Sequence, residues 1–76
     1  MNVRQLDFVT LLKRWCKGLE VEASYGVLGR EMSITPVAVF LRTKTLEKHG
    51  WVKRKKGKLY LHPKFSGGDE MEWSSL

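Results

Sequence analysis

The side chains whose chemistry stands out first are the basic residues near the C-terminal end of the chain. Between residues 53 and 58, five of six positions are Lys or Arg, and only Gly57 interrupts them. Such a block repels itself unless it is solvated or faces an anion. The whole chain of 76 residues carries 14 Lys and Arg against 8 Asp and Glu, a formal net charge of +6. The composition therefore favours a polyanion as partner.

The charge is unevenly distributed along the chain. Residues 1–65 hold all 14 basic groups and five acids, whereas residues 66–76 hold three acids and no base. The last segment opens on two consecutive glycines after Ser66 and has no hydrophobic period. We therefore expect one domain over residues 1–65 and a flexible acidic tail over residues 66–76. A further hypothesis is that this tail competes with an anionic partner for the cations.

The other residues that could do chemistry form no catalytic or metal pattern. Cys16 lies on the apolar stripe of the first helical pattern, where a cysteine is typically a small core residue. His49 and His62 are far apart in the sequence, and we expect each to be structural or to contact a phosphate. The three acids of the tail are expected to be solvated rather than to hold a metal. We predict that the protein is not an enzyme and binds no metal or cofactor.

Size and hydropathy limit the class of protein. A length of 76 residues excludes a two-domain enzyme, and 42% hydrophobic with 29% charged residues is close to the globular average. The single cysteine has no partner for an internal disulfide, which fits a reducing compartment. No run of 18 apolar residues is present. We therefore expect a cytoplasmic protein with no membrane contact, associated with the nucleoid if its polyanion partner is DNA.

Hydrophobic periodicity and capping residues define the elements that position the basic side chains. Apolar residues recur every three or four positions in three segments, and each segment follows a residue that can cap a helix. A short alternating segment predicts a strand, and two further strands flank Lys56-Gly57, a two-residue turn that suits a hairpin. The predicted order is helix 2–17, strand 19–22, helix 25–32, turn 33–35, helix 36–49 and hairpin strands 51–55 and 58–62.

Two details of this layout predict specific contacts. Pairing across the hairpin turn sets Val52 opposite Leu61 and Arg54 opposite Leu59, which leaves the other face basic with interleaved aromatic residues. Gly29 lowers the helix propensity of its segment by about 1 kcal/mol relative to alanine. We therefore expect another helix to approach the backbone closely at Gly29.

This order of elements predicts an α+β winged helix-turn-helix fold, with three helices, a short strand after helix 1 and a C-terminal two-stranded hairpin wing. The segment from Leu28 to Arg54 resembles the core of the MarR and PadR regulators of bacteria and archaea. In particular, Leu46-Glu47-Lys48-His49-Gly50-Trp51-Val52 is similar to their Leu-Glu-x-x-Gly-Leu-Val motif before the wing. The resemblance implies transcriptional control through double-stranded DNA, usually as a homodimer on a palindromic site.

From this layout we expect helix 36–49 to enter the major groove and the wing to contact the backbone or minor groove. Arg42 is the residue expected to read guanine, and Thr35 with the first amides of its helix is expected to contact phosphate. The predicted DNA-binding residues are Thr35, Arg42, Lys44, Lys53, Arg54, Lys55, Lys56 and Lys58.

One feature of helix 36–49 leaves alternatives open, because Val37, Phe40 and Leu41 make its solvent side more apolar than is usual in DNA-reading helices. Phe40 and Leu41 can pack against helix 1 or a second subunit, or can contact thymine methyl groups. Together with Val37 they can also form a docking face for a protein partner, for which the acidic tail is a second candidate. A third alternative is RNA binding, with bases stacked on Trp51 and Tyr60.

Overall fold

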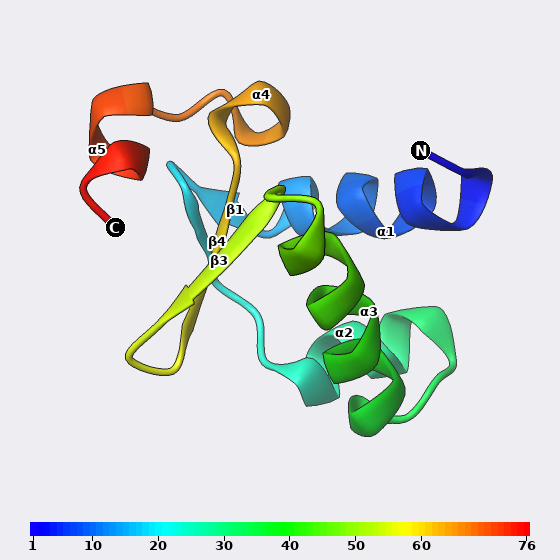
Figure 1. Cartoon of the computed structure of the whole chain (residues 1–76). Helices are drawn as coiled ribbons and strands as arrows, with labels where there is room; N and C mark the ends of the chain where they lie inside the picture. The colour runs from blue at the N-terminus through cyan, green and yellow to red at the C-terminus, as the bar shows by residue number, and fades with distance from the viewer.

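The computed structural model describes all 76 residues and shows an α+β fold with a four-stranded antiparallel sheet (Figure 1). Three of its helices are long, and the other two are short segments that follow the sheet. The elements are α1 (Val3–Arg14), β1 (Cys16–Lys17), β2 (Glu20–Val21), α2 (Tyr25–Met32), α3 (Pro36–Lys48), β3 (Val52–Lys55), β4 (Lys58–Leu61), α4 (Pro63–Ser66) and α5 (Glu70–Ser74).

The capping residues set the starts of the three long helices as predicted. Asn2 and Gln5 form a capping box, in which each side chain accepts a hydrogen bond from the other residue's backbone N–H. Ser24 Oγ accepts from the N–H of Val27, and Thr35 Oγ1 accepts from the N–H of Ala38, both at 3.1 Å. Each cap satisfies a backbone donor that has no partner inside the helix.

The end of the first helix was predicted wrongly. We expected it to continue to residue 17, but α1 ends at Arg14 and the next residues form β1, which pairs with β2. Gly18 has a φ of +64°, which lets the chain reverse between these two strands. The pairing of β2 with β4 then joins this small hairpin to the β3–β4 hairpin, giving the strand order β1-β2-β4-β3.

The C-terminal hairpin has the predicted register. Val52 lies opposite Leu61 and Arg54 lies opposite Leu59. Lys56 and Gly57 at its tip both have positive φ, +52° and +77°, as a two-residue turn requires. The inner face of the hairpin is buried against the helices, which fixes the direction in which its outer, basic face points.

A single hydrophobic core joins the three long helices to the inner face of the sheet. In Figure 1, α2 and α3 lie together at one end of the molecule, and the β3–β4 hairpin projects beside them. The largest fully buried side chains come from every layer: Phe8, Leu12, Leu19, Leu28, Leu46 and Leu61. Because α3 and the hairpin share this core, their solvent faces are held in a fixed relation.

Residues 66–76 contain more regular structure than the sequence pattern predicts. Phe65 in α4 packs edge-on against Trp51, with ring centroids 5.9 Å apart, and α4 contacts α1. Asp69 caps α5 by accepting a hydrogen bond from the N–H of Met71 at 2.8 Å. The division into a domain and a flexible tail stays a prediction.

None of the helices combines the length and apolar composition needed to cross a membrane.

Candidate nucleic-acid interface

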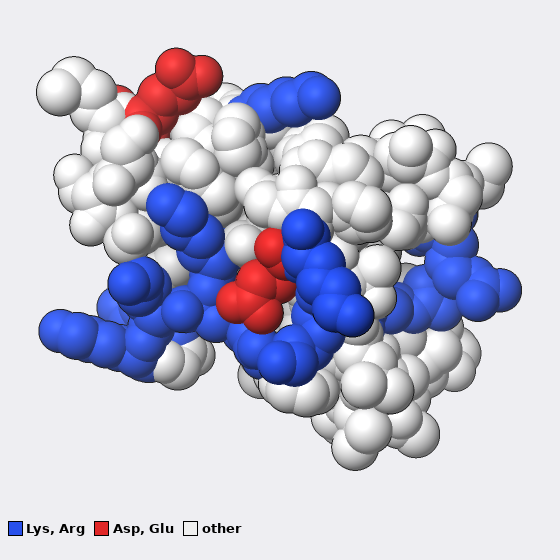
Figure 2. Space-filling model, in the orientation of Figure 1, with Lys and Arg blue, Asp and Glu red and all other residues white.

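Most basic side chains of α3 and the hairpin gather on one face of the molecule. Residues 36–61 contain eight Lys and Arg and one acid, Glu47. Figure 2 shows basic groups extending from the hairpin tip to α3, with acidic atoms between them. Cations from the helix and from the hairpin therefore share this face, but the individual side chains differ in exposure and in their partners, and Arg42 lies elsewhere.

The hairpin tip holds the most available cations. Lys55, Lys56 and Lys58 are all exposed, and Lys55 and Lys56 make no ion pair. The ammonium of Lys58 lies 3.8 Å from a carboxylate oxygen of Glu20. An exposed pair of this kind contributes only about 0–1 kcal/mol to stability, so an anionic partner can replace it.

Arg54, by contrast, ties the hairpin to the helices. Its guanidinium donates a hydrogen bond to Glu47 at 3.1 Å and lies over the ring of Phe40, with the guanidinium carbon 4.7 Å from the ring centroid. The neighbouring Tyr25 hydroxyl and then the Glu47 carboxylate raise the pKa of Arg54 above its usual range. Only 24% of its side chain is exposed. Arg54 is therefore placed to hold the hairpin against α2 and α3.

This arrangement also accounts for Phe40. Its ring is half-buried and meets that of Tyr25 edge-on, with centroids 6.1 Å apart. Within the chain it packs against Tyr25 at the start of α2 and against Arg54 of the hairpin. Packing on helix 1 or on a second subunit was one of the predicted alternatives. Val37 and Leu41 remain 68% and 59% exposed. The apolar stripe on α3 is thus limited to these two side chains.

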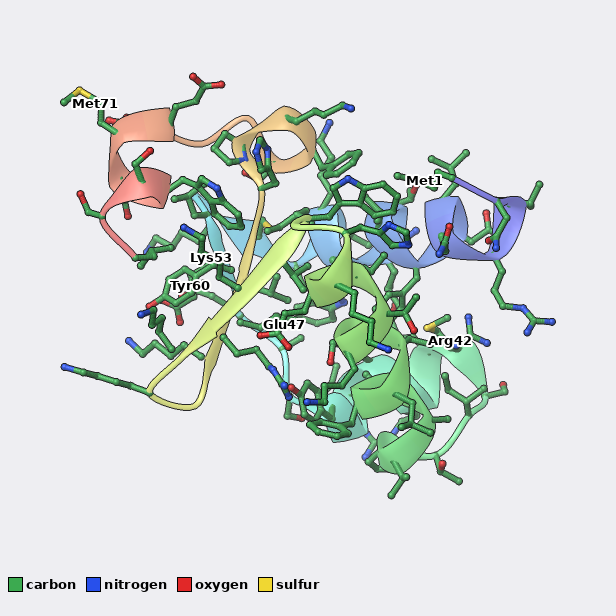
Figure 3. All side chains as sticks on the ribbon, in the orientation of Figure 1. Met1, Arg42, Glu47, Lys53, Tyr60 and Met71 are labelled. Atoms are coloured by element: carbon green, nitrogen blue, oxygen red, sulfur yellow. The ribbon has the colours of Figure 1, made fainter.

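The two predicted cations on α3 lie on different sides of the helix. Residues 37, 41, 44 and 48 follow a helical repeat along the outward face, so Lys44 and Lys48 share that face. Arg42 is half-buried and points away from the hairpin, as Figure 3 shows. The structure therefore brings Lys44 together with the β3–β4 hairpin but does not bring Arg42 there. Sequence reasoning left out Lys48, although its position four residues after Lys44 indicates the same face.

Lys53 is engaged by the C-terminal segment. Its ammonium donates a hydrogen bond to the backbone carbonyl of Trp73 at 2.9 Å and lies 4.6 Å from the centroid of that ring. The ring also packs edge-on against His62. The acidic segment thus contacts the wing through a tryptophan and a carbonyl, while its three acids remain exposed.

Replacing Trp73 with alanine is expected to release α5 from the hairpin. The change removes the aromatic contacts to Lys53 and His62, and a five-residue helix is not stable without tertiary contacts. We expect the backbone order parameters of residues 70–74, measured by ¹⁵N relaxation, to fall below about 0.6. Met71→Ala is the matched control, because Met71 is 80% exposed. Equal order parameters in the two variants would show that Trp73 does not hold α5.

Of the other predicted functional residues, Thr35 caps the exposed start of α3. The Trp51 ring stacks on His49 with centroids 4.5 Å apart and meets Phe65 edge-on. These two rings take up contacts that the predicted stacking of a base on Trp51 would need. Burial raises the pKa of Cys16 to about 11, which keeps the thiol protonated at neutral pH. The surroundings of Trp51 and Cys16 are those of structural residues.

Comparison of the chain with family models, with curated proteins and with solved structures yields no match. The interface is therefore interpreted from its own geometry and charge.

Proposed function

We propose that this chain is a small DNA-binding protein of the winged helix-turn-helix class that acts as a transcriptional regulator. The observation that supports this proposal best is the shared face of the hairpin tip and α3, on which Lys44, Lys48, Lys55, Lys56 and Lys58 are all exposed. The two acids next to this face are both paired, Glu47 with Arg54 and Glu20 with Lys58. The net field of the face is therefore strongly positive.

The shape of this face suits a duplex. The major groove is about 12 Å wide and admits an α-helix. In the proposed complex, the outward side of α3 enters that groove, with Lys44 and Lys48 near base edges or flanking phosphates. The hairpin acts as the wing and places Lys55, Lys56 and Lys58 on the backbone or minor groove. Thr35 and the start of α3 lie against a phosphate, while Arg54 keeps the wing in position.

A second copy of the chain is part of this proposal. One DNA-binding module buries only about 600–1,000 Å² of protein surface, which gives weak binding by itself. A homodimer on a palindromic site doubles that contact. The first turns of α1 offer an apolar surface for it, since Val3 and Leu6 are 75% and 53% exposed.

The proposal is tested by the salt dependence of binding to a fluorescently labelled duplex, followed by anisotropy. If about six phosphates are neutralised, the logarithm of affinity falls with the logarithm of salt concentration at a slope of about −5. Between 50 and 200 mM salt this slope corresponds to a loss of about 10³-fold. Absence of binding at 50 mM salt, or a slope near zero, would exclude DNA as the partner.

The exposure of Val37 and Leu41 favours a second candidate function, docking onto a protein partner through α3. In that case the basic wing serves solubility or electrostatic steering. The salt titration with duplex DNA separates the two candidates. Docking through an apolar face predicts no steep fall of DNA affinity with rising salt concentration.

A further inference from the structure

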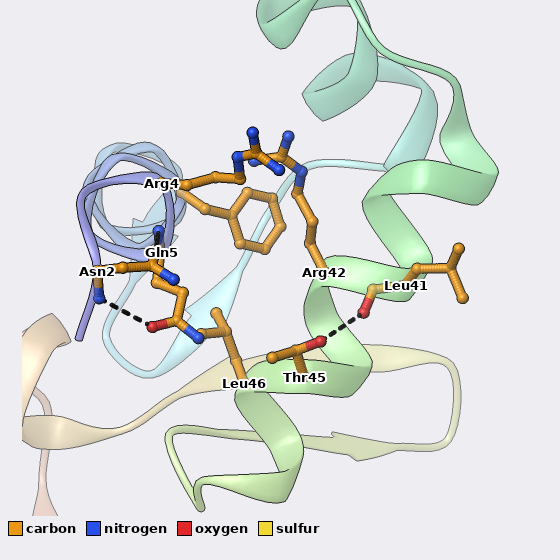
Figure 4. A pocket seen from close by; sticks show the side chains of 8 residues that line it. Asn2, Arg4, Gln5, Leu41, Arg42, Thr45 and Leu46 are labelled. Atoms are coloured by element: carbon orange, nitrogen blue, oxygen red, sulfur yellow. Dashed lines mark hydrogen bonds between the residues drawn. The ribbon is translucent and has the colours of Figure 1, made fainter.

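A second basic feature lies outside the shared face of α3 and the wing. A hollow of about 270 Å³ opens between the start of α1 and α3, as Figure 4 shows. Phe8 and Leu46, each 1% exposed, line its inner side. Arg4 comes from α1 and Arg42 from α3, and in Figure 4 their guanidinium groups point toward one another.

These two arginines have no partner of opposite charge. None of the eight residues that line the hollow is acidic, and the three ion pairs of the chain involve neither Arg4 nor Arg42. Arg14 and Arg54, in contrast, are each paired with a glutamate. Two like charges that face one hollow repel each other, and an anion placed between them removes that repulsion.

We propose that the hollow between Arg4 and Arg42 binds a phosphate group. A guanidinium presents its N–H donors as a planar fork that matches two oxygens of a phosphate, so two guanidiniums can bind one phosphate from two sides. The volume of the hollow lies just below the range of about 300–1,000 Å³ typical of pockets for whole small molecules. It suits a single phosphate group, held at the protein surface, better than an enclosed ligand.

The phosphate can come from a DNA backbone or from a free phosphate compound. The first source rests on the proposed function. In Figure 2, basic side chains lie on both sides of α3, those of the wing on one side and a second group on the other. A major groove that holds α3 is bordered by two phosphate backbones, so the wing contacts one and the Arg4–Arg42 pair contacts the other.

Binding of a free phosphate compound is tested with inorganic phosphate alone. We expect a titration followed by ¹H–¹⁵N NMR to shift the Nε–Hε signals of Arg4 and Arg42 in a saturable manner. In the double variant R4Q/R42Q, the backbone signals of Thr45 and Leu46 are expected to stop responding to phosphate. The matched control is R14Q, on the same helix but outside the hollow, in which the responses of Arg4 and Arg42 should be retained.

The backbone source is tested with duplex DNA. Neutralising one phosphate contributes about 0.9 to the salt slope, so R4Q/R42Q should reduce the slope by about 1 and lower affinity at 50 mM salt by about 15-fold. The control R14Q should leave the slope unchanged.

The outcomes separate this inference from the proposed function. Saturable phosphate shifts in a chain that binds no duplex would support the hollow as a site for free phosphate and would contradict the DNA proposal. If R4Q/R42Q reduces the salt slope of DNA binding while inorganic phosphate causes no shifts, the site would be assigned to the DNA backbone. An unchanged slope together with no shift in inorganic phosphate would overturn the inference.

Discussion

Replacing Lys55, Lys56 and Lys58 together with glutamate is expected to lower the affinity for duplex DNA by about 10³-fold at 50 mM salt. Each neutralised phosphate contributes about 0.9 to the salt slope, and at 50 mM this corresponds to about 15-fold in affinity. All three lysines are exposed at the hairpin tip, and only Lys58 has an acidic neighbour. Their loss therefore removes the largest group of available cations from the interface.

The measurement is the anisotropy titration with a labelled duplex, repeated at several salt concentrations. We expect the slope of the wing variant to be smaller than that of the original chain by about 3. The matched control is the triple variant K13E/K17E/K64E, which changes the net charge by the same amount at exposed positions outside α3 and the hairpin. Through the weaker overall field it should lose less than about 10-fold in affinity.

Comparison of these two variants separates contact from general attraction. Equal losses in both would show that only net charge matters, and the wing would then have no specific role. Retained affinity in the wing variant would remove the hairpin from the interface. Circular dichroism and thermal unfolding of both variants show whether the fold is intact. We expect only a small change in the thermal stability of the hairpin variant, because none of its three replaced lysines contributes to the core.

The starts of the helices could be predicted from the sequence because each depends on local chemistry. Asn2, Ser24 and Thr35 each accept a hydrogen bond from a backbone N–H three residues later, so a short stretch of sequence contains the whole interaction. The hairpin register is equally local, since the two-residue turn and the alternation around Val52 and Leu61 fix it.

The features that could not be predicted depend on contacts between distant residues. Strand β1 consists of two residues whose partners lie in β2, and β2 is fixed in turn by β4, about forty residues further on. No local pattern distinguishes Cys16 from the end of a helix. Helix α5 likewise depends on Trp73 meeting Lys53, which lies 20 residues earlier in the chain. Such contacts decide the structure of short segments, which have little stability of their own.

The same limit applies to the candidate site. The sequence identified the basic residues of α3 and the hairpin but could not show which are exposed and which are paired. Lys55 and Arg54, for example, are adjacent and equally charged. The difference arises from the faces of the strand: Lys55 points to solvent, and Arg54 lies against Glu47 and Phe40. Similarly, the position of Arg42 beside Arg4 follows from the packing of α1 against α3.

Replacing Gly29 with alanine is expected to lower the free energy of unfolding by about 1–2 kcal/mol. A Cβ atom at this buried position would lie 2.6 Å from the backbone carbonyl oxygen of Ile34 and 3.4 Å from a methyl group of Val39. The carbonyl belongs to the turn between α2 and α3, so it cannot rotate away as a side chain could. Overpacking costs about 1–3 kcal/mol, and a 2.6 Å contact with a backbone oxygen belongs to the upper part of that range, so the cost outweighs the gain of about 1 kcal/mol in helix propensity. The close approach predicted at Gly29 is thus made mainly by the turn.

The matched control lies three residues earlier in the same helix. Gly26 is exposed, has no positive φ, and a Cβ there would meet only Ser24 Oγ at an ordinary distance of 3.7 Å. Gly26→Ala should therefore raise the free energy of unfolding by about 0.5–1 kcal/mol through helix propensity and a less flexible unfolded chain. Urea denaturation followed by circular dichroism measures the change in the free energy of unfolding for both variants, and changes of opposite sign are expected.

Because the turn after Gly29 sets how α3 is presented, G29A should also weaken DNA binding, whereas G26A should not. Stabilisation by both substitutions would show that the α2–α3 turn is loosely packed and does not determine how α3 is presented.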